Sequence, residues 1–192
     1  MPAILRESAH GISRISIEDE LLRSGEIFLT DEVCPATMNA LLKQMMFLSR
    51  DAPNREITLY INSPGGDVTS GLAVYDFMRM TQTPIRTVCV GTAASMGAIL
   101  FLAGQKREML PHAQLMIHDP SPGGGSMAGM KPAEMEEHLG ALRQVQKILC
   151  DIVTEVSGME RRRVSAVMKK DTFFDAEKAV RFGLATGVVS KI

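Results

Sequence analysis

Between residues 26 and 118, strand-like runs alternate with helical segments, and this alternation constrains the fold more than any other feature of the sequence. Runs rich in β-branched and apolar residues cover 26–30, 57–61, 86–90 and 114–118. The segments between them repeat apolar residues at helical spacing, as from Pro35 to Leu48. The order β-α-β-α-β-α-β predicts an α/β fold, with a parallel sheet and helices outside it.

Residues 87–105 form an uncharged stretch that resembles a membrane-spanning segment. Its length is close to the roughly 20 residues that a span requires. Its first residues, 87–90, are typical of a strand, residues 91–95 are small or polar, and residues 96–103 are apolar. We therefore expect a buried strand, a tight turn at 91–95 and a buried helix, and no membrane segment.

The charge and cysteine content of the sequence argue against nucleic-acid binding and metal binding. The 192 residues include 21 basic and 22 acidic side chains, and only 5% are aromatic, with no Trp. A broad basic surface or a base-stacking platform for nucleic acid is not expected from this composition. The cysteines Cys34, Cys89 and Cys150 lie far apart, and neither they nor the histidines have metal-ligand spacing. We expect reduced thiols, no metal and a cytoplasmic location, since the first residues lack the apolar core of a signal peptide.

The pattern changes after residue 118. A stretch rich in Pro, Gly, Ser and Met covers 119–130, and a long helix with one apolar side follows, closed by Gly158. Asp175 is placed to cap a later helix. The long helix is compatible with two arrangements, a layer of the core or an arm that packs on a neighbouring subunit. The 14 methionines fit either a core or a subunit interface.

Ser95 stands where a strand leads into a buried helix and has small neighbours. A serine there can be a helix N-cap, or a nucleophile whose site is favoured by backbone N–H groups. The turn at 62–66, which ends in two glycines, follows another strand. Glycines at such a place are typical of an ordinary turn, but they also let a backbone approach a ligand closely.

His118 ends the strand-like run 114–118. Carboxyl ends of parallel strands share one edge of a sheet, so His118 should lie near Ser95 and the glycine turn. Three aspartates could orient its imidazole: Asp119, Asp171 and Asp175. Asp119 should point away because side chains alternate along a strand, and Asp175 is explained as a cap, which favours Asp171. Ser95, His118 and Asp171 thus form a candidate triad for acyl transfer or hydrolysis.

At these residues the sequence resembles the ClpP family, the proteolytic subunits of ATP-dependent Clp proteases. The resemblance runs from about residue 15 to the C-terminus. The four segments that carry it resemble the family's strand-turn-helix, nucleophile, histidine and aspartate motifs, at 60–76, 92–98, 115–120 and 171–184.

The resemblance implies a crotonase-like spiral of β-α units in one domain, 1–192. It further implies an N-terminal axial segment at 1–17 and a protruding handle at 119–158. Such subunits form homo-oligomers, in which heptameric rings stack as a tetradecamer, in some organisms mixed with a paralogue. A hexameric AAA+ unfoldase of the ClpX, ClpA or ClpC type delivers unfolded polypeptides. The unfoldase uses the ATP, so no cofactor is expected on this chain.

By the same resemblance, Ser95 is the nucleophile, His118 the general base and Asp171 the residue that orients His118. The backbone N–H groups of Gly66 and Met96 would form the oxyanion hole. The implied function is a serine endopeptidase that forms an acyl-enzyme.

The sequence departs from the family's common pattern at Asp119, where Gln is usual, and at residues 169–170, where two lysines replace an acidic-basic pair. Two alternatives remain at this point: a non-catalytic or weakly active ring paralogue, and another crotonase-fold enzyme for acyl transfer.

Overall fold

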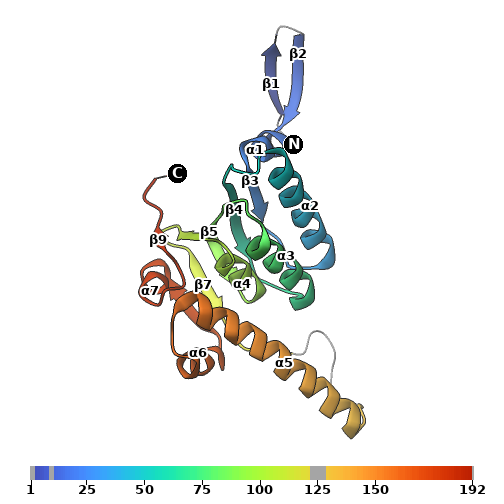
Figure 1. Cartoon of the computed structure of the whole chain (residues 1–192), viewed down its shortest axis with the longest axis vertical. Coiled ribbons are helices and arrows are strands. Elements are labelled where there is room, and N and C mark those ends of the chain that lie inside the picture. The colour runs from blue at the N-terminus through green and yellow to red at the C-terminus, as the bar shows by residue number, and fades with distance from the viewer. Residues whose placement is uncertain (1–2, 9–10, 122–128, 192) are drawn as a thin grey trace.

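The computed structural model describes residues 3–8, 11–121 and 129–191. A mostly parallel sheet forms its centre, and helices pack around that sheet (Figure 1). The strands of the parallel path run in the order β3 (Glu26–Leu29), β4 (Ile57–Ser63), β5 (Ile85–Ala94), β6 (Lys106–Met109) and β9 (Gly187–Val188). The connecting helices are α2 (Pro35–Asp51), α3 (Val68–Met80) and α4 (Met96–Leu102). The predicted α/β class is confirmed.

Strand β5 changes partner along its length, and this change creates the edge that carries the candidate site. Its first half pairs with β6, and its residues 92–94 pair with residues 114–116 of β7 (Gln114–Ile117). β7 in turn pairs antiparallel with β8 (Thr172–Asp175). The carboxyl ends of β4, β5 and β7 therefore lie close together.

The prediction of a tight turn at 91–95 is wrong, because β5 continues to Ala94. Asn62 Oδ1 accepts the N–H of Thr92 at 3.0 Å, and the next residues pair with β7. A Cβ at Gly91 would lie 2.4 Å from that Asn62 oxygen. The small residues that suggested a turn instead allow a neighbouring side chain to approach the strand.

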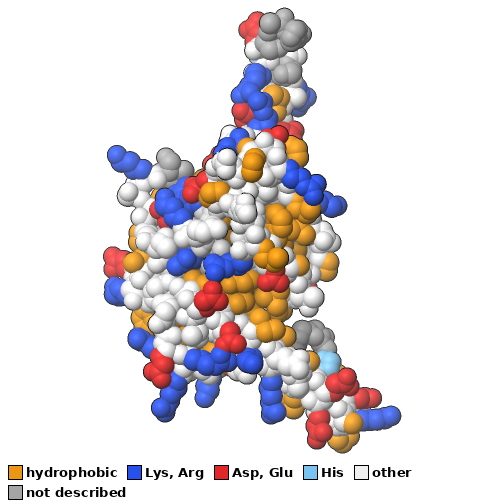
Figure 2. All heavy atoms as spheres, in the orientation of Figure 1, with side chains coloured by type: hydrophobic (Ala, Val, Ile, Leu, Met, Phe, Trp, Pro, Cys, Tyr) orange, Lys and Arg blue, Asp and Glu red, His pale blue; other side chains and the backbone are white. Residues whose placement is uncertain are grey.

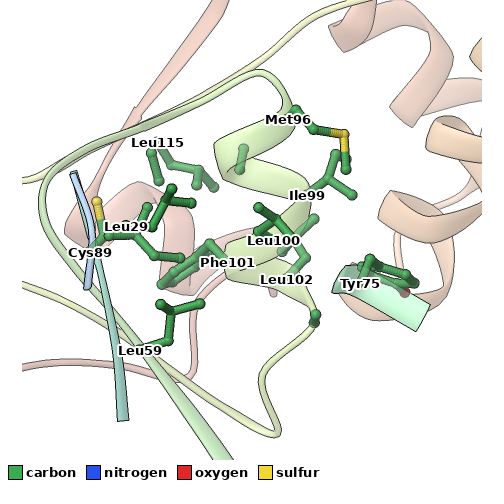
Figure 3. Packing of buried hydrophobic residues seen from close by; sticks show 14 of the residues in the cluster. Leu29, Leu59, Tyr75, Cys89, Met96, Ile99, Leu100, Phe101, Leu102 and Leu115 are labelled. Carbon is green, nitrogen blue, oxygen red and sulfur yellow. The ribbon is translucent and has the colours of Figure 1, made fainter. Parts of the chain in front are cut away.

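Helix α4 lies within the hydrophobic core, and all seven of its residues are buried. Figure 3 shows its side chains among those of the surrounding strands and of α3. The uncharged stretch 87–105 is thus divided between β5 and α4. In the part of the chain that the structure describes, no helix is long and apolar enough to cross a membrane.

The helix ends predicted at Asp175 and Gly158 are confirmed. Asp175 caps α7 (Ala176–Arg181) through the Lys178 N–H at 2.7 Å, and Asp67 caps α3 in the same way by accepting the Ser70 N–H at 2.7 Å. Gly158, with φ of 68°, ends the long helix α5 (Pro132–Ser157). These caps satisfy backbone groups that a helix end leaves unpaired.

Helix α5 projects from the body as an arm (Figure 1). Its buried residues all belong to its last third: Leu149, Cys150, Ile152 and Val153. Leu139 nearer the tip is 42% exposed, and charged side chains crowd that end (Figure 2). Of the two arrangements left open by the sequence, the structure favours a projecting arm over a layer of the core, and packing of that arm on a neighbouring subunit stays a prediction. The stretch rich in Pro, Gly, Ser and Met at 119–130 lies in part, at 122–128, outside the described residues.

The remaining elements are the helices α1 (Ile17–Ser24) and α6 (Arg161–Met168) and a hairpin of β1 (Ala3–Ser8) and β2 (Gly11–Ser16). The hairpin stands away from the body at the opposite end from α5 (Figure 1). An Arg6–Glu20 ion pair of 2.6 Å joins it to α1. The molecule therefore has two projections, one on either side of the sheet.

Candidate active site

Ser95 joins β5 to α4 in an unusual backbone conformation. Its φ is 53° and its ψ is −120°, and it is the only non-glycine with positive φ among the residues the structure describes. Such a conformation is costly and is typical of functional sites. Ser95 occupies the N-cap position, but its side chain makes no capping hydrogen bond. Its Oγ instead lies 2.8 Å from His118 Nε2.

His118 follows β7 and is held by hydrogen bonds on both sides. Before it, Ser95 N–H donates to the Met116 carbonyl at 2.9 Å, and after it, Asp119 N–H donates to the Met168 carbonyl at 2.6 Å. The two ring nitrogens face different partners, Ser95 Oγ on one side and Asp171 on the other. With a proton on Nδ1, Nε2 is free to accept the Ser95 hydroxyl proton.

Of the three candidate aspartates, the structure brings only Asp171 to the imidazole. Its Oδ1 lies 3.4 Å from His118 Nδ1. This contact is longer than the roughly 2.7–2.9 Å of a strong charge-assisted hydrogen bond. Asp119 instead accepts a hydrogen bond from Gln146 of α5 at 2.8 Å, and Asp175 serves as a cap. The side chain of Asp171 is 65% exposed, so solvent screens the contact.

The glycine turn between β4 and α3 places Gly66 beside Ser95. Val33 N–H donates to the Gly65 carbonyl and Asp67 N–H to the Val33 carbonyl, both at 2.7 Å. This bridge fixes Gly66 in an orientation that leaves its own N–H unused. A Cβ at Gly65 would lie 2.6 Å from the Ala94 carbonyl and 2.7 Å from Ser95 Cβ, so only glycine fits this close approach.

The N–H groups of Gly66 and Met96 have no acceptor among the described residues. Met96 is the first residue of α4, where a helix leaves its N–H groups unpaired. Both residues line one cavity together with Ser95 and His118. Two unused donors beside a serine can bind a developing negative charge.

The cavity has a volume of about 460 Å³. Its floor is made of buried apolar side chains: Met96, Ile99, Ile117, Leu149 and Met168. Its exposed rim includes Glu32 and Asp67. Hydrogen bonds from Ser70 lower the pKa of the Asp67 carboxyl, which keeps it ionised near neutral pH. The cavity thus combines an apolar floor with an acidic rim.

Among the cysteines, hydrogen bonds from Thr37 lower the pKa of the half-buried Cys34 thiol, and Cys89 differs from it. Cys89 is buried in β5, and burial raises the pKa of its thiol to about 11, so the reactive thiolate is scarce near neutral pH. Within 3–8, 11–121 and 129–191, no group of three or more His, Cys, Asp and Glu could hold a metal ion. The expectation that the chain binds no cofactor stays a prediction.

Glu32 and the link between Asp119 and Gln146 were missed by the sequence analysis. Glu32 follows β3, whose carboxyl end meets the same edge as those of β4 and β5. The strand-end argument that selected His118 therefore also applied to the residues after β3. Gln146 gave no such signal, because only the packing of α5 brings it to Asp119.

The structure thus brings together all five residues proposed from the sequence. Comparison with known protein families adds an independent finding. The model of the family described as Clp protease matches residues 9–192. This range spans both strand ends that carry Ser95 and His118, the projecting helix α5 and the segment with Asp171. The chain belongs to the Clp protease family, a family of peptidases.

Proposed function

We propose that the chain is a serine endopeptidase in which Ser95, His118 and Asp171 act together. The observation that carries the proposal is the 2.8 Å contact between Ser95 Oγ and His118 Nε2, made by a serine held in a strained conformation. A serine whose only task was to cap α4 would turn its hydroxyl toward the helix N–H groups.

In the first step, Ser95 Oγ attacks the carbonyl carbon of the scissile peptide bond while its proton passes to His118 Nε2. The carbonyl oxygen becomes negative and accepts hydrogen bonds from the Gly66 and Met96 N–H groups. When the tetrahedral intermediate collapses, the C–N bond breaks and the amine leaves with the proton from His118. Ser95 is then esterified by the acyl half of the substrate.

In the second step, water attacks the acyl-enzyme and gives a proton to His118. The second intermediate collapses, the ester bond breaks and Ser95 recovers a proton from His118. Asp171 orients the imidazole and stabilises its charged form in both steps. The chain's own groups suffice for this chemistry, in keeping with the expectation that no cofactor is bound.

We further propose that the chain acts as a subunit of a closed proteolytic chamber. Family membership supports heptameric rings stacked as a tetradecamer, fed with unfolded polypeptide by an ATP-using AAA+ unfoldase. The exposed tip of α5 supports the same view, because an arm with exposed apolar residues such as Leu139 gains by packing on another subunit. The three unpaired thiols support a reducing compartment such as the cytoplasm.

The test compares wild type with Ser95→Ala in hydrolysis of a short fluorogenic peptide. We expect loss of a triad member to cost about 10⁴-fold to 10⁶-fold in kcat, while the variant sediments like wild type. A non-catalytic ring subunit would show no activity in either protein. A crotonase-fold enzyme acting on a thioester through the two N–H groups would retain activity on its acyl substrate without Ser95.

A further inference from the structure

Two carboxylates, Glu32 and Asp67, border the cavity that contains Ser95 and His118. Both side chains belong to exposed residues, whereas the apolar floor is buried. The described residues that line the cavity include no lysine or arginine. The entrance to the proposed site therefore carries two negative charges on one rim.

Both carboxylates lie beside the backbone N–H proposed to hold the substrate's carbonyl oxygen. Asp67 is the neighbour of Gly66 in the chain. Glu32 lies across the bridge between Val33 and Gly66, and a Cβ on Gly66 would come within 3.0 Å of its Cγ. A peptide bound with its carbonyl oxygen at Gly66 would place the adjoining side chains within reach of this rim.

These charges are not neutralised by neighbours. Asp67 Oδ1 accepts a hydrogen bond from the Ser70 N–H, which favours the ionised form of the Asp67 carboxyl. The hydrogen bond that Glu32 accepts from the Thr37 hydroxyl is made by its backbone carbonyl and not by its side chain. Among the described residues, every lysine, arginine and histidine that forms an ion pair does so with an acidic residue other than Glu32 and Asp67. An unpaired acidic rim attracts a cationic side chain and repels an anionic one.

We propose that Glu32 and Asp67 determine specificity: peptides with a lysine or arginine on either side of the residue that precedes the scissile bond are cleaved in preference to peptides with an acidic residue there. This inference rests on the proposed peptidase function. The apolar floor receives one uncharged side chain of the substrate, and the acidic rim selects a neighbouring one. Attraction in one case and repulsion in the other should together give about a tenfold preference for lysine over glutamate.

The experiment measures kcat/KM of the full-length protein on matched fluorogenic peptides. Each peptide has leucine before the scissile bond, and Lys, Gln or Glu occupies either the position before that leucine or the position after the bond. In at least one series we expect the order Lys, then Gln, then Glu. The Lys-to-Glu ratio should shrink between about 50 mM and about 500 mM salt, since salt screens exposed charges.

Two substitutions remove the charges with little other change. Asp67→Ser keeps a side chain that caps α3, and Glu32→Gln keeps the shape of the residue. In the double variant the Lys-to-Glu ratio should fall to about one. Asp76→Asn, an exposed position further along α3, is the matched control and should keep the wild-type ratio.

A wild-type ratio of one in both series, or a ratio that survives in the double variant, would overturn the inference while leaving the peptidase proposal intact. Failure of every peptide to be cleaved, together with no labelling of Ser95 by a serine-directed phosphonate, would instead overturn the proposed function and this inference with it. The two failures are therefore distinguishable.

Discussion

Ser95 and Asp171 contact opposite sides of the His118 ring, but the surroundings of these two residues differ. Ser95 lies between β5 and α4, and every residue of α4 is buried in the body. Asp171 precedes β8, a strand that among the described residues pairs with β7 alone, and the side chain of Asp171 is 65% exposed. The contact on the serine side is 2.8 Å and that on the aspartate side 3.4 Å.

This difference indicates which part of the candidate site, the serine side or the histidine-aspartate side, is positioned by contacts within a single chain. The serine half depends on packing that is complete within the body. The histidine-aspartate half adjoins α5, and Gln146 links that helix to the residue after His118. Catalytic groups often tighten only when substrate or a partner binds. We infer that assembly through the α5 arm would act mainly on the aspartate side.

Asp171→Asn tests the aspartate side with the largest expected effect. Removing the charge leaves the imidazole poorly oriented, and we expect kcat to fall by about 10³-fold in the peptide assay. Asp175→Ser is the matched control, since serine can still cap α7 and the residue lies outside the cavity. A change of less than about threefold for Asp171→Asn would show that the 3.4 Å contact contributes little to catalysis.

Gly65→Ala tests the serine side. The added methyl group would overlap the Ala94 carbonyl and Ser95 Cβ, so the turn or Ser95 must move. A displacement of about 1 Å can cost a hundredfold in rate, and we expect a loss of that order in kcat. Circular dichroism separates this effect from unfolding. Full activity in a folded variant would contradict the account of how the turn positions Ser95.

Gln146→Ala tests the link between α5 and the histidine. Asp119 would lose its hydrogen-bond donor, and we expect kcat to fall about tenfold with little change in KM, since the cavity lining is untouched. Gln144→Ala changes the same residue type at an exposed position of the same helix and should have no effect. Equal activities of the two variants would mean that α5 does not position His118 through this bond.

Gly140→Ala has the smallest expected effect and concerns the arm alone. A Cβ at this position meets nothing within 4 Å, so alanine should stabilise α5 by up to about 1 kcal/mol. Thermal unfolding measures the gain, and sedimentation reports on assembly. A lower oligomeric state in the variant would show that another subunit packs closely against this point of the arm.

The sequence predicted the body of the fold because its strands and helices are apolar on their buried sides. Strand β6 was missed because its residues are mostly charged: Glu108 pairs with Arg86 at 2.6 Å, and Arg107 donates to the Leu184 carbonyl at 2.9 Å. Only the folded chain brings these partners together. The same holds for β8, whose partner β7 is distant in sequence.

The candidate site was more accessible to sequence reasoning than its surroundings. Strand ends and glycine spacing were enough to place His118 and Gly66 near Ser95, and the structure brings these residues together. Their catalytic roles stay predictions. The backbone strain at Ser95 and the hydrogen bond between Gln146 and Asp119 have no local signature, because both arise from packing between segments far apart in the chain.

The central claim is that His118 activates Ser95, and the rate of covalent labelling tests it most directly. The protein is treated with a fluorophosphonate, and the modified peptide is identified by mass spectrometry in wild type, His118→Ala and the exposed control His112→Ala. We expect one adduct, on Ser95, that forms at the same rate in wild type and His112→Ala and at least about a hundredfold more slowly in His118→Ala. An adduct on another residue, or equal rates in all three proteins, would contradict the account.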